Sequence, residues 1–150
     1  NYVMQFILEN KKINRDLLNP IYESLQGHIY EYSIHKFASN VVERALTFGK
    51  KEMQQNIINE IVQLQEKNPD YIITMVKDKF GNYVIQKLIE HSDPISQQKL
   101  IQAILDKQNL IKNDGFSKHV LNYIEKKTNM GGGRTIGGKG GNGRLGKRDN

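Results

Sequence analysis

The sequence predicts an all-α protein built as an α-solenoid, a stack of similar helical units. Three observations support this fold class. Apolar residues recur at helical spacing, each of the three prolines stands where a helix should begin, and one segment recurs along the chain at intervals near 40 residues. No run of alternating apolar and polar residues indicates a strand. The 150 residues suffice for one domain with a hydrophobic core.

Two long helices are predicted by the spacing of their apolar side chains. They are EMQQNIINEIVQLQ at 52–65 and SQQKLIQAILDKQ at 96–108. Helix starts are predicted where a capping side chain precedes proline: Asn19-Pro20, Asn68-Pro69 and Asp93-Pro94. Gly49 and Gly115 fall at the expected breaks between helices.

The internal repeat defines the architecture. KFASNVVER at 36–44 and KFGNYVIQK at 79–87 are near-twins, and the chain's first residues, NYVMQFIL, match NYVIQKLI at 82–89. A weaker fourth copy, FSKHVLNYI at 116–124, keeps only the apolar positions. The equivalent positions are 1, 39, 82 and 118, so the intervals are 38, 43 and 36 residues. Periods of this length in a helical chain are typical of stacked repeats.

Three polar positions vary while the apolar scaffold is kept. On a helix, residues 39 and 43 lie one above the other, and residue 40 lies beside them. We expect the apolar neighbours Phe37, Val41, Val42 and Leu46 on the buried side. Stacking the helices then places the three sets, which we call triads, in a ladder along one surface. The triads are Asn1, Tyr2 and Gln5; Ser39, Asn40 and Glu43; and Asn82, Tyr83 and Gln86.

The chemistry of the triads matches the edges of RNA bases. Asn with Gln supplies donors and acceptors, which suit O2, O4 and N3–H of uracil. The carboxylate of Glu43 only accepts, which suits the two adjacent donors of guanine. Tyr2 and Tyr83 offer flat faces for base stacking, and Asn40 offers a smaller platform. A single N-Y-x-x-Q is typical of a solvated helix face. Here it occurs in two copies, and the copy between them carries S-N-x-x-E, which suits a different base, so the pattern favours base reading.

At these residues the sequence resembles the Pumilio family of RNA-binding proteins, over about residues 1–128. One base read per repeat is that family's known code. The resemblance implies a right-handed α-solenoid of three-helix repeats, here about three repeats and a C-terminal cap. It also implies that the RNA runs antiparallel to the chain, so that the triads select 5′-UGU-3′. The base-edge residues would be Asn1, Gln5, Ser39, Glu43, Asn82 and Gln86, and the stacking residues Tyr2, Asn40, Tyr83 and His119.

The same resemblance implies a role for the whole protein. We expect a cytoplasmic monomer that binds 3′ untranslated regions of messenger RNA and represses them. Deadenylation or translational-repression proteins are its expected partners on the convex face. The first repeat lacks its lead-in before Asn1, and the chain starts without Met, so we expect a piece of a longer protein. The fourth copy carries Lys118, His119 and Asn122, which is no standard triad.

Several alternatives stay open. His119 either stacks on a base or faces solvent in the cap, and Lys36 and Lys79 either touch phosphate or are simply solvated. The competing function is a protein-binding scaffold of the armadillo or HEAT kind, whose repeats have similar periods. It leaves the alternation between N-Y-x-x-Q and S-N-x-x-E unexplained.

Charge and composition limit which other functions the sequence indicates. Residues 131–150 hold nine of the 13 glycines and five basic side chains against one acidic, which predicts a flexible basic tail from 129 to 150. That tail either adds sequence-independent RNA affinity or serves as a linker. The rest has 17 basic and 15 acidic side chains, so charge alone does not indicate nucleic acid. Without cysteine there are no disulfides or thiolate metal sites, which suits a reducing compartment.

No catalytic or metal arrangement is evident. The four histidines lack metal-ligand spacing, no catalytic Ser, His and Asp set recurs, and no apolar run could span a membrane. We therefore expect no enzyme, no cofactor, no metal and no membrane partner. His35 and Asp78 stand at equivalent positions before two triads, and we expect both to serve at helix entry.

Overall fold

Helices follow one another through the described part of the chain. The computed structural model describes residues 18–130, with side chains for 20–129. Every regular element in this range is an α-helix: α2 (Leu18–Leu25), α3 (Ile29–Ser33), α4 (Ala38–Phe48), α5 (Lys51–Lys67), α6 (Asp70–Lys77), α7 (Gly81–His91), α8 (Pro94–Leu105), α9 (Gln108–Ile111) and α10 (Gly115–Met130). The predicted all-α class is confirmed.

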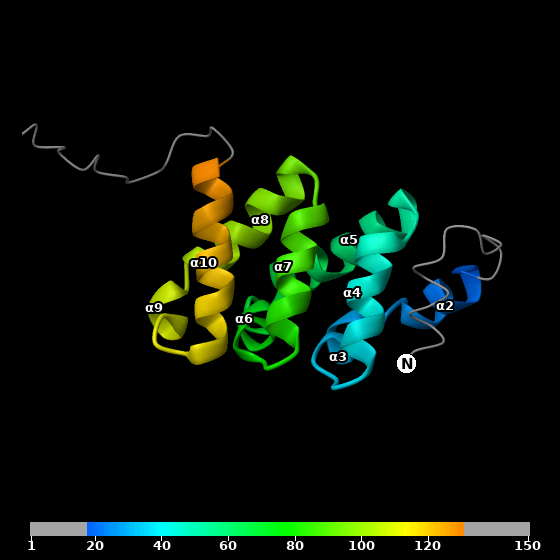
Figure 1. Cartoon of the computed structure of the whole chain (residues 1–150), viewed down its shortest axis with the longest axis horizontal. Coiled ribbons are helices and arrows are strands. Elements are labelled where there is room, and N and C mark those ends of the chain that lie inside the picture. Colours follow the sequence, from blue (N-terminus) through cyan, green and yellow to red (C-terminus); the bar gives the residue numbers. More distant parts are fainter. Residues whose placement is uncertain (1–17, 131–150) are drawn as a thin grey trace, which may run out of the picture.

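Three helices make one repeat. Helices α3, α4 and α5 form one unit, α6, α7 and α8 form the next, and α9 and α10 form a shorter last unit. Equivalent helices stand in rows, and Figure 1 shows α4, α7 and α10 side by side. Within the rows α4 packs on α7, α7 on α10, and α5 on α8. The predicted solenoid of three-helix repeats is confirmed.

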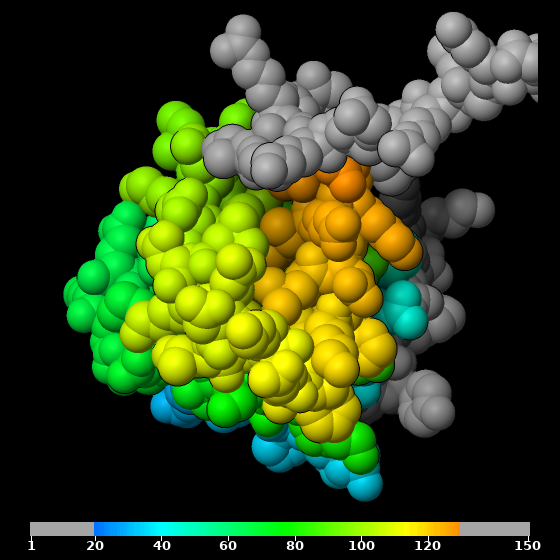
Figure 2. All heavy atoms as spheres, turned by 90° about the vertical axis from the view of Figure 1, so that its left-hand side faces the viewer, coloured from blue at the N-terminus to red at the C-terminus, as the bar shows by residue number. Residues whose placement is uncertain are grey.

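The stack has two distinct faces. Figure 2 looks along it from the end formed by α9 and α10, with α10 on one side and α8 and α5 on the other. We call α4, α7 and α10 the front row, and α2, α5 and α8 the back row. The triads predicted from the sequence belong to front-row helices.

Helices begin at two of the three predicted proline signals, whereas α2 already includes Leu18 and Asn19, so the Asn19-Pro20 signal lies within its helix. Helix α8 starts at Pro94, and the Asp93 carboxylate accepts the Ser96 N–H at 2.7 Å. This bond holds the pKa of Asp93 below its ordinary value. Helix α6 starts directly after Pro69, and Asn68 Oδ1 accepts the Asp70 N–H at 3.0 Å.

The two long helices differ from prediction only at their ends. Helix α5 extends beyond the predicted 52–65 by one residue at its start and two at its end. Helix α8 ends at Leu105, the last apolar residue of its stripe, and the chain then turns into the separate four-residue α9. Residues predicted to lie at 106–108 in one helix therefore form this turn and the start of α9.

A single apolar core runs through the repeats. Helices α3 to α8 all contribute fully buried side chains. The largest are Ile29, Leu46, Ile57, Ile58, Ile61, Ile72, Met75, Ile85, Leu88, Ile89, Leu100 and Ile104. The prediction that Val41, Val42 and Leu46 are buried is confirmed, but the prediction for Phe37 is wrong, since that ring is 61% exposed. Phe37 precedes the first residue of α4, so the helical spacing that buries its neighbours does not apply to it.

Candidate RNA-binding interface

The two described triads lie at the same place on neighbouring front-row helices. Positions 39, 40 and 43 fall at the start of α4, and positions 82, 83 and 86 fall at the start of α7. Because α4 packs directly on α7, the triads are neighbours along one face of the stack. The third predicted triad, Asn1, Tyr2 and Gln5, lies outside the described residues.

Each front-row helix is started by one side-chain acceptor. Asp78 Oδ2 accepts the Phe80 and Gly81 N–H groups, both at 2.8 Å, before α7. Before α10, Asp114 Oδ2 accepts the Ser117 N–H at 2.8 Å. Unpaired N–H groups at a helix start need such acceptors.

In the first unit the acceptor is His35. Its Nδ1 accepts the Phe37 and Ala38 N–H groups at 3.1 and 3.2 Å, before α4. His35 thus occupies the place of Asp78, and the expected helix-entry role of both side chains is seen.

The triad members differ in exposure. Tyr83 is 49% exposed and Asn40 is also exposed, whereas Ser39 is 2% and Asn82 is 0% exposed. The buried positions lie three residues before Val42 and Ile85, so they flank the buried stripe of their helices. In both described triads the second position is therefore exposed, the third position is half-buried and the first position is buried.

Asn82 is buried with one half of its amide unused. Its Nδ2 donates to the backbone carbonyls of Asp78 and Lys79, at 2.8 and 2.9 Å. Its Oδ1 is buried without a partner in the described part of the chain. A buried acceptor with no donor is rare and needs an explanation. It can accept a hydrogen bond from a bound group that supplies one.

Glu43 is a half-buried carboxyl group beside two cations. Burial raises its pKa above the ordinary 4.5, while Lys87 on α7 and the adjacent Arg44 oppose this rise. Sequence reasoning assigned no role to Arg44 and Lys87. Both residues stand one position after the third member of a triad, and this shared position in the repeat could have indicated their place beside Glu43.

An aromatic pair links α7 to the last unit. The rings of Tyr83 and His119 are 6.4 Å apart between centroids and inclined by 23°. Both side chains are exposed, as are Lys118 and Asn122 on α10. The two near-parallel rings face the same side as the triads.

The lysines that precede α4 and α7 lie over phenylalanine rings. Lys36 Nζ is 5.3 Å from the Phe37 centroid, and Lys79 Nζ is 5.7 Å from that of Phe80. Within residues 20–129, no group of three His, Asp or Glu side chains could hold a metal ion. None of the described helices combines the length and apolar character that crossing a membrane requires.

Comparison with known proteins identifies the repeats. Two stretches, 28–62 and 71–105, match the profile described as a Pumilio-family RNA binding repeat, and each stretch falls on one three-helix unit. The mRNA-binding protein PUF3 of Saccharomyces cerevisiae is 37% identical over 122 residues. The chain belongs to the Pumilio family. Its alignment with PUF3 spans 74% of this chain and 13% of the yeast protein.

Solved Pumilio structures share the fold. The Puf3 RNA binding domain bound to the Cox17 RNA 3′ UTR recognition sequence site A superposes with a TM-score of 0.69 and 31% identity, over 83% of this chain and 38% of that domain. PUF-8 in complex with PBE-RNA superposes with a TM-score of 0.70 and 26% identity, over 84% of this chain and 36% of the other. The chain thus covers well under half of each of these two solved structures.

Proposed function

We propose that this chain binds single-stranded RNA through its front row and selects 5′-UGU-3′, with one base for each triad. The proposal rests on two chemically different triads at equivalent positions of adjacent helices. Pumilio membership and the RNA bound in the similar solved structures support it. In the whole protein this module acts on 3′ untranslated regions in the cytoplasm, as a monomeric repressor that recruits deadenylation or translational-repression proteins.

The 5′ uracil belongs to the triad on α7. The Gln86 side chain makes no hydrogen bond within the described residues, so its amide is available to one uracil carbonyl oxygen. The unpartnered Oδ1 of Asn82 accepts N3–H of the same base. RNA binding thereby satisfies the buried acceptor of Asn82, which has no donor within residues 20–129.

Tyr83 and His119 hold a base by stacking. Nucleotides stacked on one another are about 3.4 Å apart, so a base between two rings needs about 6.8 Å. The 6.4 Å between the two centroids is close to this gap. Of the two interpretations of His119, the one we propose is therefore stacking.

Guanine belongs to the triad on α4. Glu43 supplies an acceptor-only carboxylate for the N1–H and N2–H₂ donors, Ser39 adds a hydroxyl, and Asn40 supplies the stacking surface. Lys87 and Arg44 help to keep Glu43 ionised, which this pairing requires. Asn1, Tyr2 and Gln5 read the second uracil.

Fluorescence anisotropy at one fixed salt concentration tests this function. The wild type is expected to bind UGU-containing RNA more tightly than UUU or UAU, by about 1–3 kcal/mol per mismatch. Tyr83→Ala should weaken binding to all three by a similar factor, because stacking tolerates any base. A chain shortened to residues 1–130 is the control. Equal affinity for all three RNAs, lost on shortening, would assign binding to the basic tail instead.

A further inference from the structure

The three front-row helices begin with the same set of hydrogen bonds. One residue before each helix accepts N–H groups of the first turn through its side chain. Its carbonyl oxygen accepts the N–H of the residue four positions later, at 3.1 or 3.2 Å. That residue is His35 before α4, Asp78 before α7 and Asp114 before α10. The position of the acceptor is repeated, but its chemistry differs in the first unit.

The backbone bonds of His35 reach the triad on α4, for which we proposed guanine. Its carbonyl oxygen accepts the Ser39 N–H at 3.1 Å, and its Nδ1 accepts the Phe37 and Ala38 N–H groups at 3.1 and 3.2 Å. The Asn40 N–H in turn donates to the Phe37 carbonyl oxygen at 3.2 Å. The first two members of this triad thus belong to the turn that the imidazole holds in place.

Only the neutral imidazole can act as this acceptor. Nδ1 has a free lone pair in the uncharged tautomer, whereas both ring nitrogens are donors in the protonated ring. A positive charge at a helix start is also unfavourable, because the unpaired N–H groups there carry partial positive charge. Histidine changes charge between about pH 5 and 8, whereas aspartate side chains are normally ionised throughout that range. Protons therefore act on the acceptor of α4 and spare those of α7 and α10.

The surroundings of His35 leave it open to protonation. Its side chain is exposed at a hollow of about 300 Å³ between α2, α3 and α4, where Tyr32 of α3 is the other titratable lining residue. On its own segment Lys36 is adjacent, and the Phe37 ring lies 6.1 Å from the imidazole between centroids. Within residues 20–129 no carboxylate forms an ion pair with His35. A protonated ring therefore has no negative partner among these residues.

We propose that His35 is a positioning residue for guanine recognition and makes the selection of guanine, but not of the 5′ uracil, dependent on pH. The inference rests on the proposed function of the triads. In its neutral form the ring holds the first turn of α4, which keeps Ser39 and Asn40 in place for the base. Protonation releases two N–H groups of that turn, so the fraction of molecules with an ordered triad falls and guanine is bound less tightly. The triad on α7 keeps the acceptor that Asp78 provides.

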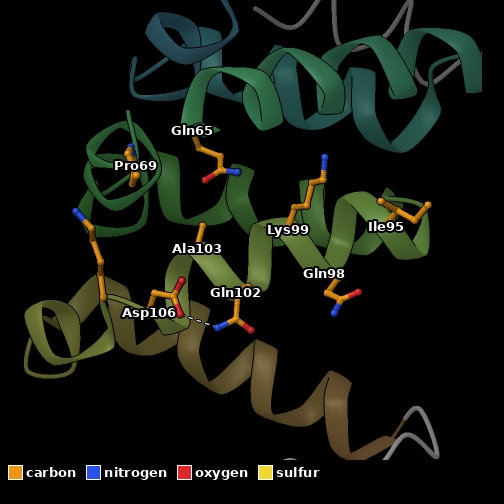
Figure 3. A pocket seen from close by; sticks show the side chains of 9 residues that line it. Gln65, Pro69, Ile95, Gln98, Lys99, Gln102, Ala103 and Asp106 are labelled. Carbon is orange, nitrogen blue, oxygen red and sulfur yellow. Dashed lines mark hydrogen bonds between the residues drawn. The ribbon is translucent and has the colours of Figure 1, made fainter. Parts of the chain in front are cut away.

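The variant His35→Asn separates this effect from the protonation of Glu43. Asparagine accepts through Oδ1 at any pH in this range and adds no charge. The chain already uses this acceptor at the start of α6, beside Pro69 (Figure 3), where Asn68 Oδ1 accepts the Asp70 N–H at 3.0 Å. Both proteins keep Glu43, so any difference between their pH profiles belongs to His35.

Fluorescence anisotropy at one fixed salt concentration measures the two profiles. The quantity compared is the ratio of the affinities for RNAs that contain UGU and UUU, which cancels the general attraction of an imidazolium ion for phosphate. We expect the wild type and His35→Asn to have the same ratio, within about twofold, at about pH 8. At about pH 6 the wild-type ratio should be lower than that of His35→Asn by at least about threefold.

Moving the histidine should move the pH dependence. Asp78→His gives α7 the acceptor that α4 has, so its preference for UGU over AGU should decline from about pH 8 to about pH 6. The wild-type preference for UGU over AGU should stay constant over the same range. Thermal melting at each pH verifies that both variants are folded.

The structural step is measured without RNA. Hydrogen exchange followed by NMR should show that protection of the Phe37 and Ala38 amides falls between about pH 7 and 5.5, relative to the equivalent Phe80 and Gly81 amides. His35→Asn should remove this difference. Unchanged relative protection in the wild type would overturn the inference.

The outcomes distinguish this inference from the function on which it rests. Equal wild-type affinity for UGU and UUU at about pH 8 would refute the proposed function and this inference with it. A wild-type preference for UGU whose pH profile coincides with that of His35→Asn would leave the function intact and overturn the inference. A folded Asp78→His variant whose selection of the 5′ uracil does not depend on pH would contradict it as well.

Discussion

At the residue scale, the proposed guanine contact of Glu43 depends on the protonation state of its carboxyl group. Burial raises its pKa, so the folded state favours the protonated carboxyl, and Glu43 stabilises the fold fully only below its ordinary pKa of 4.5. That contribution is lost as the pH rises through the raised pKa. The proposed pairing with guanine, however, requires the ionised form. Glu43 therefore lowers the stability of the fold at neutral pH in the protonation state that the proposed pairing needs.

The preference for UGU over UUU should decline as the pH is lowered from about 7 toward the raised pKa of Glu43. Protonation places an O–H donor on the Glu43 carboxyl group, opposite the N1–H and N2–H₂ donors of guanine, so the pairing is weakened. Anisotropy titrations at several pH values measure the ratio of the two affinities. Glu43→Gln should show a low ratio that is independent of pH, with a free energy of unfolding at neutral pH no lower than that of the wild type. The same pH dependence in both proteins would contradict this role.

The acceptor before α4 gives a second prediction at this scale. His35 performs with a neutral nitrogen what Asp78 and Asp114 perform with carboxylates, and a negative charge is favoured at a helix start. His35→Asp should raise the free energy of unfolding by about 0.3–1 kcal/mol, and His35→Ala should lower it by about 0.5–2 kcal/mol. Urea denaturation measures both. A lower stability of His35→Asp would show that another contact of the imidazole matters more.

At the element scale, Glu60 joins two helices that are distant in sequence. It accepts two N–H groups at the start of α3 from its place on α5. Glu60→Ala leaves both without this acceptor and should lower the free energy of unfolding by about 1–3 kcal/mol. Glu66→Ala, six residues further along α5, removes an exposed ion pair with Lys99 and should change the free energy of unfolding by no more than about 0.5 kcal/mol. Equal losses in both variants would contradict the junction role of Glu60.

The helices show what local sequence can predict. Helices α5 and α8 have enough turns for an apolar stripe, so their existence and approximate bounds follow from spacing. Helices α3 and α9, with five and four residues, are too short to show a period. The bonds of Glu60 join residues 31 and 33 positions apart, and only the packed repeats reveal them.

At the scale of the whole molecule, the stacking of repeats turns local patterns into a surface. The repeat places both described triads on adjacent helices, as the sequence predicted. The depth of Ser39 and Asn82 was not predictable, because the packing of neighbouring repeats determines it.

The most direct test of the central claim exchanges one triad for the other. The triple variant Ser39→Asn, Asn40→Tyr, Glu43→Gln gives α4 the triad of α7 and leaves the scaffold unchanged. Anisotropy at fixed salt would compare its binding to RNAs that contain UGU, UUU or UAU. We predict that the wild type prefers UGU and that the variant prefers UUU. A folded variant with unchanged preference would show that the triads do not select the base.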